Sequence, residues 1–286
     1  MRGKTTIAAG LLALAVLAIV AAPASAAKNP KIAAEVPKAI AAKGTLIVAS
    51  DATYAPMEFV ATNGKTVVGV DADLAKAIGN VLGLTFKMKN ATFDGIIPGL
   101  QAGKYDIGMS SFTDTKARQK VVDFVTYFSA GTSFYTKASG GTTVKGLASL
   151  CGLTVSVENG TTEQSDATAQ SAKCKKAGKA AVKVSAFPDQ NAANLAITSG
   201  KAQIGMADSP VAAYIVKQSH GQFKLTGTSY GTAPYGIALP KGNGMTKPVL
   251  DAVKLLITNG TYKSILAKWG LQGGAISNPK INGATS

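Results

Sequence analysis

An eight-residue segment occurs twice in this chain, and this repeat restricts the possible folds more than any other feature. Gly103–Ser110, with the sequence GKYDIGMS, returns as Gly200–Ala207, with the sequence GKAQIGMA, at an offset of 97 residues. Each copy is typical of a helix end, a turn and a short strand. Chance similarity between two Gly-Lys turns is one explanation. The explanation that we favour is a pair of related α/β lobes, each offering the C-terminal end of a strand to a shared cleft, where open α/β sheets bind ligands.

Short β-branched or apolar runs alternate with helical patterns along the chain, which favours an α/β architecture. Strands are predicted at 45–50, 84–89, 107–109, 154–157, 182–186 and 204–207. Helices are predicted from a cap at Asp71 to a stop at Gly83, at 96–101, after Gly160, and at 192–199, 246–258 and 262–269. Residues 272–286 are predicted to form a poorly structured tail.

The first 26 residues have the composition of an export signal. Arg2 and Lys4 give a positive start, residues 7–20 are apolar, and Ala26 ends a small-x-small cleavage pattern. The apolar stretch is too short for a comfortable membrane span. No cysteine follows the cleavage site, so a lipid anchor is not indicated. We expect a mature protein that is soluble in the periplasm.

The charge of the mature chain is strongly positive, at +13 from 28 cationic and 15 acidic residues. The lysines are scattered, no basic run is interleaved with aromatic residues, and the protein is expected to leave the cytoplasm. Nucleic acid is therefore not expected as a partner. Cys151 and Cys174 are the only cysteines, and in an oxidising compartment they should form a disulfide. A metal site is not expected, since the single histidine, His220, is far from them in sequence.

Beyond the leader, Arg118 is the only arginine against 27 lysines. Its planar guanidinium can hold a carboxylate by two parallel hydrogen bonds, which an ammonium cannot. The alternative is that Arg118 caps a helix or pairs with a surface acid.

Polar side chains follow four of the predicted strands, and they suit a zwitterionic ligand. They are Asp51, Ser110, Ser111, Thr113, Thr161, Thr162 and Asp208, with the rings of Tyr54 and Phe93 nearby. A guanidinium suits an α-carboxylate, a carboxylate suits an α-ammonium, and rings suit an aliphatic stem. Taken singly, each has another explanation: Asp51 and Asp208 as helix caps, Thr161 as a turn residue, and Phe93 as core.

An ordered set of motifs over more than two hundred residues resembles a known family. The motifs are VASDATYAPMEF at 48–59, GVDADLA at 69–75, FDGIIPGL at 93–100, TDTKAR at 113–118, VDF at 122–124, GTTE at 160–163, ADSP at 207–210, YGIALPKG at 235–242 and NGTYKSILAKW at 259–269. In these the chain resembles the bacterial solute-binding proteins of polar amino-acid ABC importers, family 3, and especially the glutamine-binding type.

The resemblance implies a type II periplasmic binding protein fold, with two α/β lobes joined by two hinge strands near 131–135 and 233–237. The implied division is a signal peptide at 1–26, a linker at 27–43, lobe 1 at 44–131 and 237–271, lobe 2 at 132–236, and a tail at 272–286. The Cys151–Cys174 disulfide would tie the strand at 154–157 to the helix after Gly160. The implied partners are an amino acid and a membrane permease with its ATPase, and we expect a monomer without cofactor.

The resemblance also assigns roles to single residues. Arg118 matches the arginine that binds the ligand carboxylate, and Asp208 matches the aspartate that binds its ammonium group. Ser111 and Thr113 match groups that bind the ligand main chain, and Thr162 matches a backbone donor. Asp51, Tyr54 and Phe93 match positions around the ligand's stem and side chain.

Two departures put glutamine in doubt as the ligand. Glu158 stands where the glutamine-specific members have a lysine, and Ala207 stands where they have a histidine. With Asp51 opposite, Glu158 would make the side-chain end of the pocket acidic and favour a cationic or donor-rich side chain. The alternative is that Glu158 turns outward to solvent.

Two rival functions remain. Dehydratases and murein lyases resemble this family, and Glu158 or Glu163 could serve as an acid or base, but no Ser/His/Asp set, metal cluster or phosphate loop accompanies them. The second rival is a sensor that acts in trans on a membrane kinase. The prediction is an extracytoplasmic binding component that captures a polar amino acid, with a cationic one favoured, and catalyses no reaction.

Overall fold

A single mixed sheet passes through the whole molecule, and the computed structural model describes residues 26–284 of it. The sheet has eight strands in the order β5-β1-β6-β11-β7-β10-β8-β9. They are β1 (Thr45–Ser50), β5 (Thr85–Asn90), β6 (Ile107–Gly108), β7 (Val122–Lys137), β8 (Thr154–Glu158), β9 (Lys183–Phe187), β10 (Ile204–Asp208) and β11 (Phe223–Pro240). A small second sheet contains β2 (Thr53–Tyr54), β3 (Glu58–Val60) and β4 (Val67–Val68).

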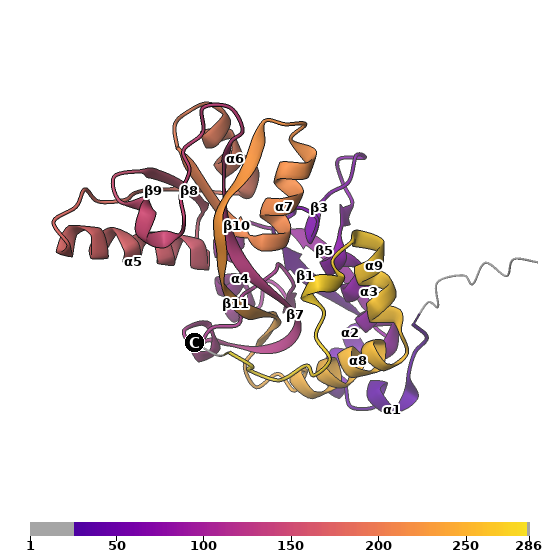
Figure 1. Ribbon diagram of the computed structural model, residues 1–286. Coiled ribbons are helices and arrows are strands. Elements are labelled where there is room, and N and C mark those ends of the chain that lie inside the picture. Colours follow the sequence, from indigo (N-terminus) through magenta and orange to yellow (C-terminus); the bar gives the residue numbers. More distant parts are fainter. Residues whose placement is uncertain (1–25, 285–286) are drawn as a thin grey trace, which may run out of the picture.

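The helices divide between the two ends of this sheet (Figure 1). Those at the β5-β1-β6 end, which we call the first lobe, are α1 (Pro30–Ala33), α2 (Lys38–Lys43), α3 (Val70–Leu82), α4 (Phe93–Gln101), α8 (Thr246–Thr258) and α9 (Thr261–Trp269). Those at the β10-β8-β9 end, the second lobe, are α5 (Thr162–Lys176), α6 (Gln190–Thr198) and α7 (Ser209–Gln218). Short 3₁₀ turns form η1 (Arg118–Lys120), η2 (Leu147–Leu150) and η3 (Gln272–Gly274). This is the predicted two-lobed α/β fold.

The long antiparallel strands β7 and β11 connect the lobes, and the two copies of the sequence repeat flank them symmetrically. In the first copy, Gly108 of β6 pairs with Ala238 of β11, whereas in the second, Gly205 of β10 pairs with Tyr135 of β7. A Cβ atom at Gly205 would lie 2.1 Å from the Tyr135 ring, so a side chain is excluded there. The repeat therefore marks equivalent strands of two related lobes.

The predicted elements are present, with changes at their ends. Helix α3 buries Leu74, Ile78 and Val81 on one face and ends at Gly83, where φ is +69°. Its N-cap, however, is Gly69, so the prediction that Asp71 caps this helix is wrong. Asp71 lies in the first turn, fully buried, where its carboxylate instead accepts hydrogen bonds from a neighbouring loop and strand.

The C-terminal segment is ordered by contacts that sequence analysis did not foresee. Lys280 O accepts a hydrogen bond from Thr126 N, and Asn282 Oδ1 accepts one from Phe124 N. These residues add a short pairing to the free edge of β7 in the first lobe, with a bridge between Val125 and Ile281. The prediction of a poorly structured tail is therefore wrong for residues 272–284, because unpaired backbone groups of β7 bind this segment.

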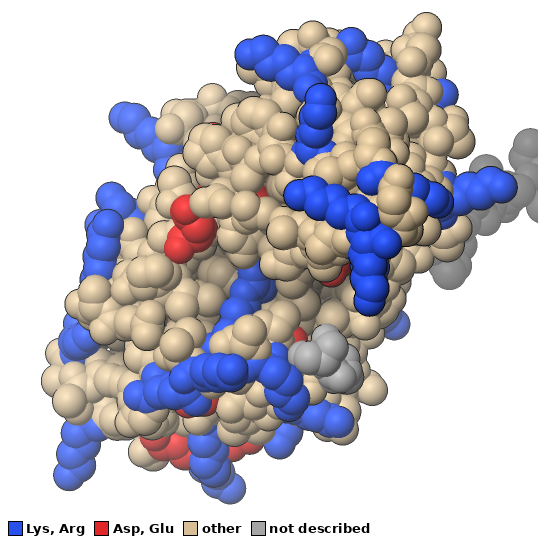
Figure 2. All heavy atoms as spheres, turned by 90° about the vertical axis from the view of Figure 1, so that its left-hand side faces the viewer, with Lys and Arg blue, Asp and Glu red and all other residues tan. Residues whose placement is uncertain are grey.

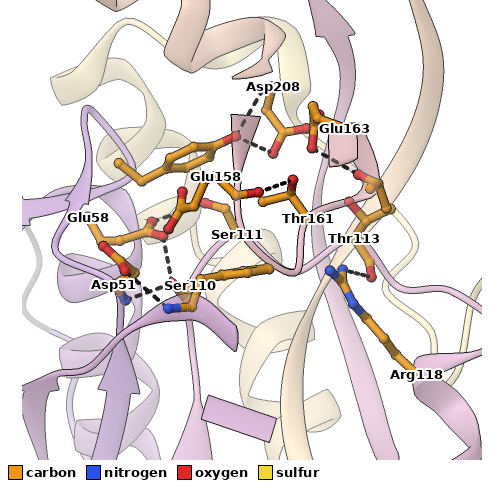
Figure 3. A pocket seen from close by; sticks show the side chains of 13 residues that line it. Asp51, Glu58, Ser110, Ser111, Thr113, Arg118, Glu158, Thr161, Glu163 and Asp208 are labelled. Carbon is orange, nitrogen blue, oxygen red and sulfur yellow. Dashed lines mark hydrogen bonds between the residues drawn. The ribbon is translucent and has the colours of Figure 1, made fainter. Parts of the chain in front are cut away.

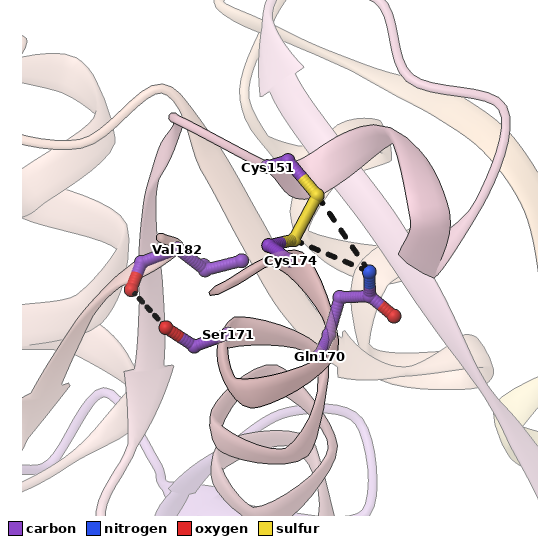
Figure 4. Close-up of a disulfide and its surroundings, with 5 residues drawn as sticks. All are labelled: Cys151, Gln170, Ser171, Cys174 and Val182. Atoms are coloured by element: carbon purple, nitrogen blue, oxygen red, sulfur yellow. Dashed lines mark hydrogen bonds between the residues drawn. A yellow bond between two sulfur atoms is a disulfide. The ribbon is translucent and has the colours of Figure 1, made fainter. Parts of the chain in front are cut away.

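The disulfide joins Cys151, just after η2, to Cys174 near the end of α5, with 5.6 Å between the Cα atoms (Figure 4). Ser171 Oγ, on the same helix, donates a hydrogen bond to Val182 O. The disulfide therefore ties the segment just before β8 to α5, as predicted. Among residues 26–284, no helix has the length and apolar character needed to cross a bilayer.

Candidate functional site

A small pocket lies between the lobes at the ends of their strands (Figure 3). Eleven lining residues are those that sequence analysis named: Asp51, Tyr54, Phe93, Ser110, Ser111, Thr113, Arg118, Glu158, Thr161, Thr162 and Asp208. Glu58 and Glu163 also line it. The structure thus brings all the proposed site residues together, and Glu158 does not turn outward: it is only 2 % exposed. Their roles toward a ligand stay predictions.

Arg118 lies where the two lobes meet. Its Nη1 donates a hydrogen bond to Thr113 O in the first lobe at 2.8 Å, and its Nη2 donates one to Gly160 O in the second at 2.9 Å. The guanidinium carbon is 5.2 Å from the centre of the Phe93 ring, which stacks on Phe112. Burial lowers the pKa of Arg118 from its usual value, and Glu163 and Asp208 oppose this shift. No carboxylate among the described residues forms a salt bridge with it, so three of its five N–H donors remain for a ligand.

Asp51 is held rigidly by its own lobe. Its Oδ1 accepts hydrogen bonds from Thr53 Oγ1 at 2.6 Å and Thr53 N at 3.2 Å, and its Oδ2 accepts one from Phe93 N at 3.1 Å. Burial raises the pKa of Asp51, and these hydrogen bonds limit the rise. Asp51 is not the N-cap residue of a helix, but its carboxylate accepts a hydrogen bond from the first amide of α4, so it supports that helix end and also lines the pocket.

Glu158, at the end of β8, lies next to Asp51 in the pocket, close enough for the two carboxyl groups to share a hydrogen bond (Figure 3). Its Oε1 is buried with no hydrogen-bond partner in the described part of the chain. Burial, and then the charge of Asp51, raises the pKa of Glu158 to about 10. A buried carboxyl oxygen without a donor is costly, and two adjacent carboxyl groups repel each other when both are ionised, so this end of the pocket favours a cation or a hydrogen-bond donor.

Asp208 is also buried, at the junction of β10 and α7. Its Oδ2 accepts a hydrogen bond from Tyr54 Oη at 3.1 Å, and the backbone N of Asp208 donates a hydrogen bond to Tyr54 Oη at 3.0 Å. Burial, followed by the charge of Glu163, raises the pKa of Asp208 well above its usual value. Asp208 occupies the N-cap position of α7 without a side-chain capping bond, so its carboxylate is not used by the helix.

Thr161, for which a turn position was considered, has a different structural role as well as a place in the pocket. It is the N-cap of α5, where its Oγ1 accepts a hydrogen bond from Gln164 N and donates one to Glu158 O. This contact fixes the backbone of Glu158 relative to the start of α5. The N-terminal turn of α5, with its partial positive charge, therefore points toward the pocket from the second lobe.

Sequence reasoning missed Glu58 as a pocket residue and considered Glu163 only as an acid or base. Glu163 accepts hydrogen bonds from Thr132 Oγ1 at 2.7 Å and Thr162 Oγ1 at 3.1 Å. Glu58 accepts one from each of two pocket serines, Ser110 and Ser111. Both lie inside the family motifs, at 48–59 and 160–163, which was the signal available.

The lobes are in contact around the pocket. Besides the Tyr54–Asp208 and Arg118–Gly160 bonds, Gln190 N donates to Thr53 Oγ1 at 3.1 Å, and Asn159 Nδ2 donates to Asp94 Oδ2 at 2.6 Å. In the residues that the structure describes, no group of three or more His, Cys, Asp or Glu side chains is arranged to hold a metal ion. The site suits recognition of a small, highly polar molecule enclosed between two lobes.

Comparison with known proteins decides the family. Residues 46–272 match the model of the bacterial extracellular solute-binding proteins, family 3. The chain belongs to this family. An arginine-binding protein of Corynebacterium glutamicum is 35% identical over 254 residues, which are 88% of this chain and 83% of the relative.

Solved structures of the family agree in fold. An ancestral arginine-binding protein bound to arginine has a TM-score of 0.72 at 39% identity, covering 79% of this chain and 98% of the other. An ancestral amino acid-binding protein, a precursor of cyclohexadienyl dehydratase, has a TM-score of 0.72 at 34% identity, covering 81% of this chain and 97% of the other. The named relatives of this solute-binding family are thus mainly binding proteins.

Proposed function

We propose that this family member is the extracytoplasmic binding component of an ABC importer and that its ligand is a cationic amino acid of the arginine type. The observation that carries the proposal is the buried Glu158 Oε1, which faces Asp51 and has no partner among residues 26–284. A cationic side chain would give both carboxylates a partner, which a neutral amide does less well.

The overall charge of the pocket supports this choice. Five carboxyl groups line it, those of Asp51, Glu58, Glu158, Glu163 and Asp208, against the single cation of Arg118. Because the pKa of Glu158 is raised to about 10, this residue holds its proton in the ligand-free protein at neutral pH, and a cationic side chain would take the place of that proton. A zwitterion with a neutral side chain adds no net charge, whereas arginine, lysine or ornithine adds one positive charge. In a poorly solvated site this difference has a large effect on affinity. The relative and the ancestral structure named above, described as arginine-binding, point in the same direction.

The proposed binding mode uses both lobes. The free N–H donors of Arg118 bind the α-carboxylate together with groups of Thr113 and Thr162, and Asp208 binds the α-ammonium group. Ser111, whose N–H and O–H already donate to Asp71 and Glu58, offers the ligand main chain an acceptor. The hydroxyl of Tyr54, which contacts Asp208 in the structure, would shift or remain as a second contact. Phe93 covers the aliphatic stem, and the side-chain cation ends between Asp51 and Glu158.

Closure over the ligand requires a hinge, which we place in β7 at 131–135 and in β11 at 233–237. The pairing of these strands supports this placement, because its register shifts between Thr226 and Tyr230, between Tyr230 and Ala233, and between Tyr235 and Gly236. Irregular pairing leaves backbone groups free to change conformation. The corresponding lobe division is 44–131 with 237–271, and 132–236.

The proposal includes export of a monomer to the periplasm, cleavage near Ala26, and delivery to a permease and its ATPase. The positive charge of the surface is compatible with this role: lysines are scattered over the face seen in Figure 2, with few acids among them. Catalysis is not part of the proposal. His220, the only imidazole, is exposed on the turn after α7, outside the residues that line the pocket.

A thermal-shift screen tests the ligand class, because a ligand that binds only the folded state raises the melting temperature. Purified mature protein is screened against the twenty amino acids, ornithine and citrulline. We expect the largest shifts from arginine, lysine, ornithine or histidine. The variant Glu158→Gln should lose this preference and shift it toward glutamine or citrulline, whereas Asp166→Asn, on α5 outside the pocket, should retain it. Equal shifts from neutral and cationic amino acids in the wild type would contradict the proposal.

A further inference from the structure

Two buried carboxyl groups, those of Glu58 on β3 and Asp71 in the first turn of α3, lie in contact beneath the pocket. Both side chains are 0% exposed, they lie close enough to share one hydrogen bond, and Ser111 donates hydrogen bonds to both. Their remaining partners are a backbone amide and three hydroxyl groups. Within the described residues, neither carboxylate takes part in a salt bridge with a lysine or arginine. The proposed ligand does not use this pair directly.

Two adjacent carboxylates in a dry site cannot both ionise, so they must share a proton. Burial raises the pKa of Asp71 to about 6, and burial together with the charge of Asp71 raises the pKa of Glu58 well above its usual value. At neutral pH the pair therefore retains one proton, which bridges the two side chains.

The pair holds the loop that follows β6. Ser110 Oγ donates a hydrogen bond to Glu58 Oε1 at 3.0 Å and accepts one from Asp51 N at 2.8 Å. Ser111 Oγ donates to Glu58 Oε2 at 3.0 Å, and Ser111 N donates to Asp71 Oδ2 at 2.9 Å. Ser111 has a φ of +48°, which is unfavourable for a residue other than glycine and persists only where neighbouring contacts enforce it.

The groups that face the pair come from four elements, and all of them are accounted for. Besides β3, α3 and the loop at 110–111, strand β7 contributes Tyr127, whose Oη donates to Asp71 Oδ1 at 2.7 Å. Burial, and then the charges of Asp71 and Glu58, raises the pKa of Tyr127 well above its usual value, so Tyr127 remains a neutral donor. Titration of the pair is thus not masked by a neighbouring cation or by loss of the Tyr127 proton.

We propose that Glu58 and Asp71 are positioning residues that act through one shared proton, holding Ser110 and Ser111 in the conformation that the ligand requires. The proposal rests on the proposed function for the identity of the ligand. The shared proton of Glu58 and Asp71 does not depend on that function. If the proton is lost, two adjacent negative charges remain in a fully buried site, and Ser111 is released from its unfavourable conformation. Ligand affinity should therefore fall as pH rises.

The sign for stability follows from linkage. Carboxyl pKa values that are raised in the folded state mean that the folded protein binds more protons than the unfolded chain, so stability falls as pH rises above about 4.5 and toward the raised values. Glu58→Gln supplies a permanent donor toward Asp71 and mimics the protonated pair, so this part of the pH dependence should disappear. Glu58→Ala removes the acceptor of both serines and cannot act as a mimic.

The test compares wild type, Glu58→Gln, Glu58→Ala and Asp73→Asn from about pH 5 to about pH 9, with and without arginine. Asp73 lies on the same helix and pairs with Lys268 at the surface, so it is the matched control. We expect the melting temperature of ligand-free wild type and of Asp73→Asn to fall with pH more steeply than that of Glu58→Gln. As pH rises over this range, the arginine affinity of wild type should fall at least about threefold relative to that of Glu58→Gln. Glu58→Ala should bind arginine about a hundredfold more weakly than wild type at every pH.

Parallel pH profiles for wild type and Glu58→Gln, in both stability and affinity, would overturn the proposal. If Glu58→Gln does not fold, Asp71→Asn, which likewise replaces one of the two carboxyl groups by an amide, takes its place. If no amino acid binds at any pH, the proposed function fails, while the ligand-free profiles still decide whether the pair shares a proton.

Discussion

The two lobes contribute to the pocket in different ways. On the first-lobe side, Asp51 has three hydrogen bonds, all from its own lobe, and Ser110 and Ser111 are both bound to Glu58. On the second-lobe side, Glu158 Oε1 has no partner in the described chain, and Asp208 depends on Tyr54 of the other lobe. The comparison teaches that the first lobe is a preformed half-site, whereas the second is completed only by closure or by the ligand.

The difference has a physical basis in the backbone. The first-lobe carboxylates are surrounded by loops that supply donors locally, such as Thr53 and Phe93 N for Asp51. Two second-lobe carboxylates, those of Glu158 and Asp208, lie at the last residues of β8 and β10, whereas Glu163, in the first turn of α5, accepts hydrogen bonds from Thr132 and Thr162. Thr161 uses its hydroxyl to cap α5, and so it donates to the backbone oxygen of Glu158 and not to its carboxylate.

The largest expected effect comes from Arg118, which bridges the two sides. Arg118→Lys should leave the fold intact and weaken arginine binding by roughly 2–5 kcal/mol, because an ammonium cannot reproduce a bidentate pair with a carboxylate or the two carbonyl contacts. Calorimetry of wild type and variant measures this loss. The substitution keeps the positive charge, so the loss reports the geometry of the guanidinium, and Lys116→Ala, which removes an exposed cation nearby, should bind arginine as the wild type does. An affinity within a few-fold of wild type, with an unchanged circular dichroism spectrum, would contradict the role of Arg118 at the junction.

The second effect concerns the rigidity of the second lobe away from the pocket. Replacing Cys151 and Cys174 together by serine should destabilise the folded protein by about 3 kcal/mol in the chain-entropy model, since the bond closes a loop across 23 positions. Arginine affinity at low temperature should remain unchanged, because the disulfide lies outside the pocket lining. Denaturant unfolding measures the change in stability, and calorimetry measures the arginine affinity. A large loss of affinity in the folded variant would mean that the disulfide, and not closure, shapes the second half-site.

A smaller effect is expected from the segment that supports the first lobe. Asn282→Ala should cost about 1–2 kcal/mol of stability, because Phe124 N loses its acceptor and alanine does not favour the positive φ of +51° at this position. Lys280→Ala keeps the backbone pairing of the same segment and is the control. Equal melting temperatures for the two variants would show that the segment does not stabilise the first lobe.

Much of the fold and of the pocket could be predicted from the sequence, because hydrophobic period and repeated motifs report on local structure. The positions of Asp51, Ser111 and Asp208 followed from strand ends, which meet at one edge of an α/β sheet. Asp71 was assigned to a helix cap because its local sequence resembles one, and only tertiary contacts with Ser111 and Tyr127 reveal its buried position. The contacts of the C-terminal segment with β7 were equally hidden, since backbone pairing across more than 150 residues leaves no pattern in the sequence.

The central claim is that the unpaired acidic end of the second lobe selects a cationic side chain. The most direct measurement is calorimetric titration of the wild-type protein with arginine and with citrulline, which have nearly the same shape and differ in charge. We expect arginine to bind at least about tenfold more tightly, a difference of about 1.4 kcal/mol, and raised salt to narrow this gap only modestly because the cleft is closed. If citrulline binds as tightly as arginine or more tightly, Glu158 and Asp51 do not select charge, and the protein is a binder of polar amino acids in general.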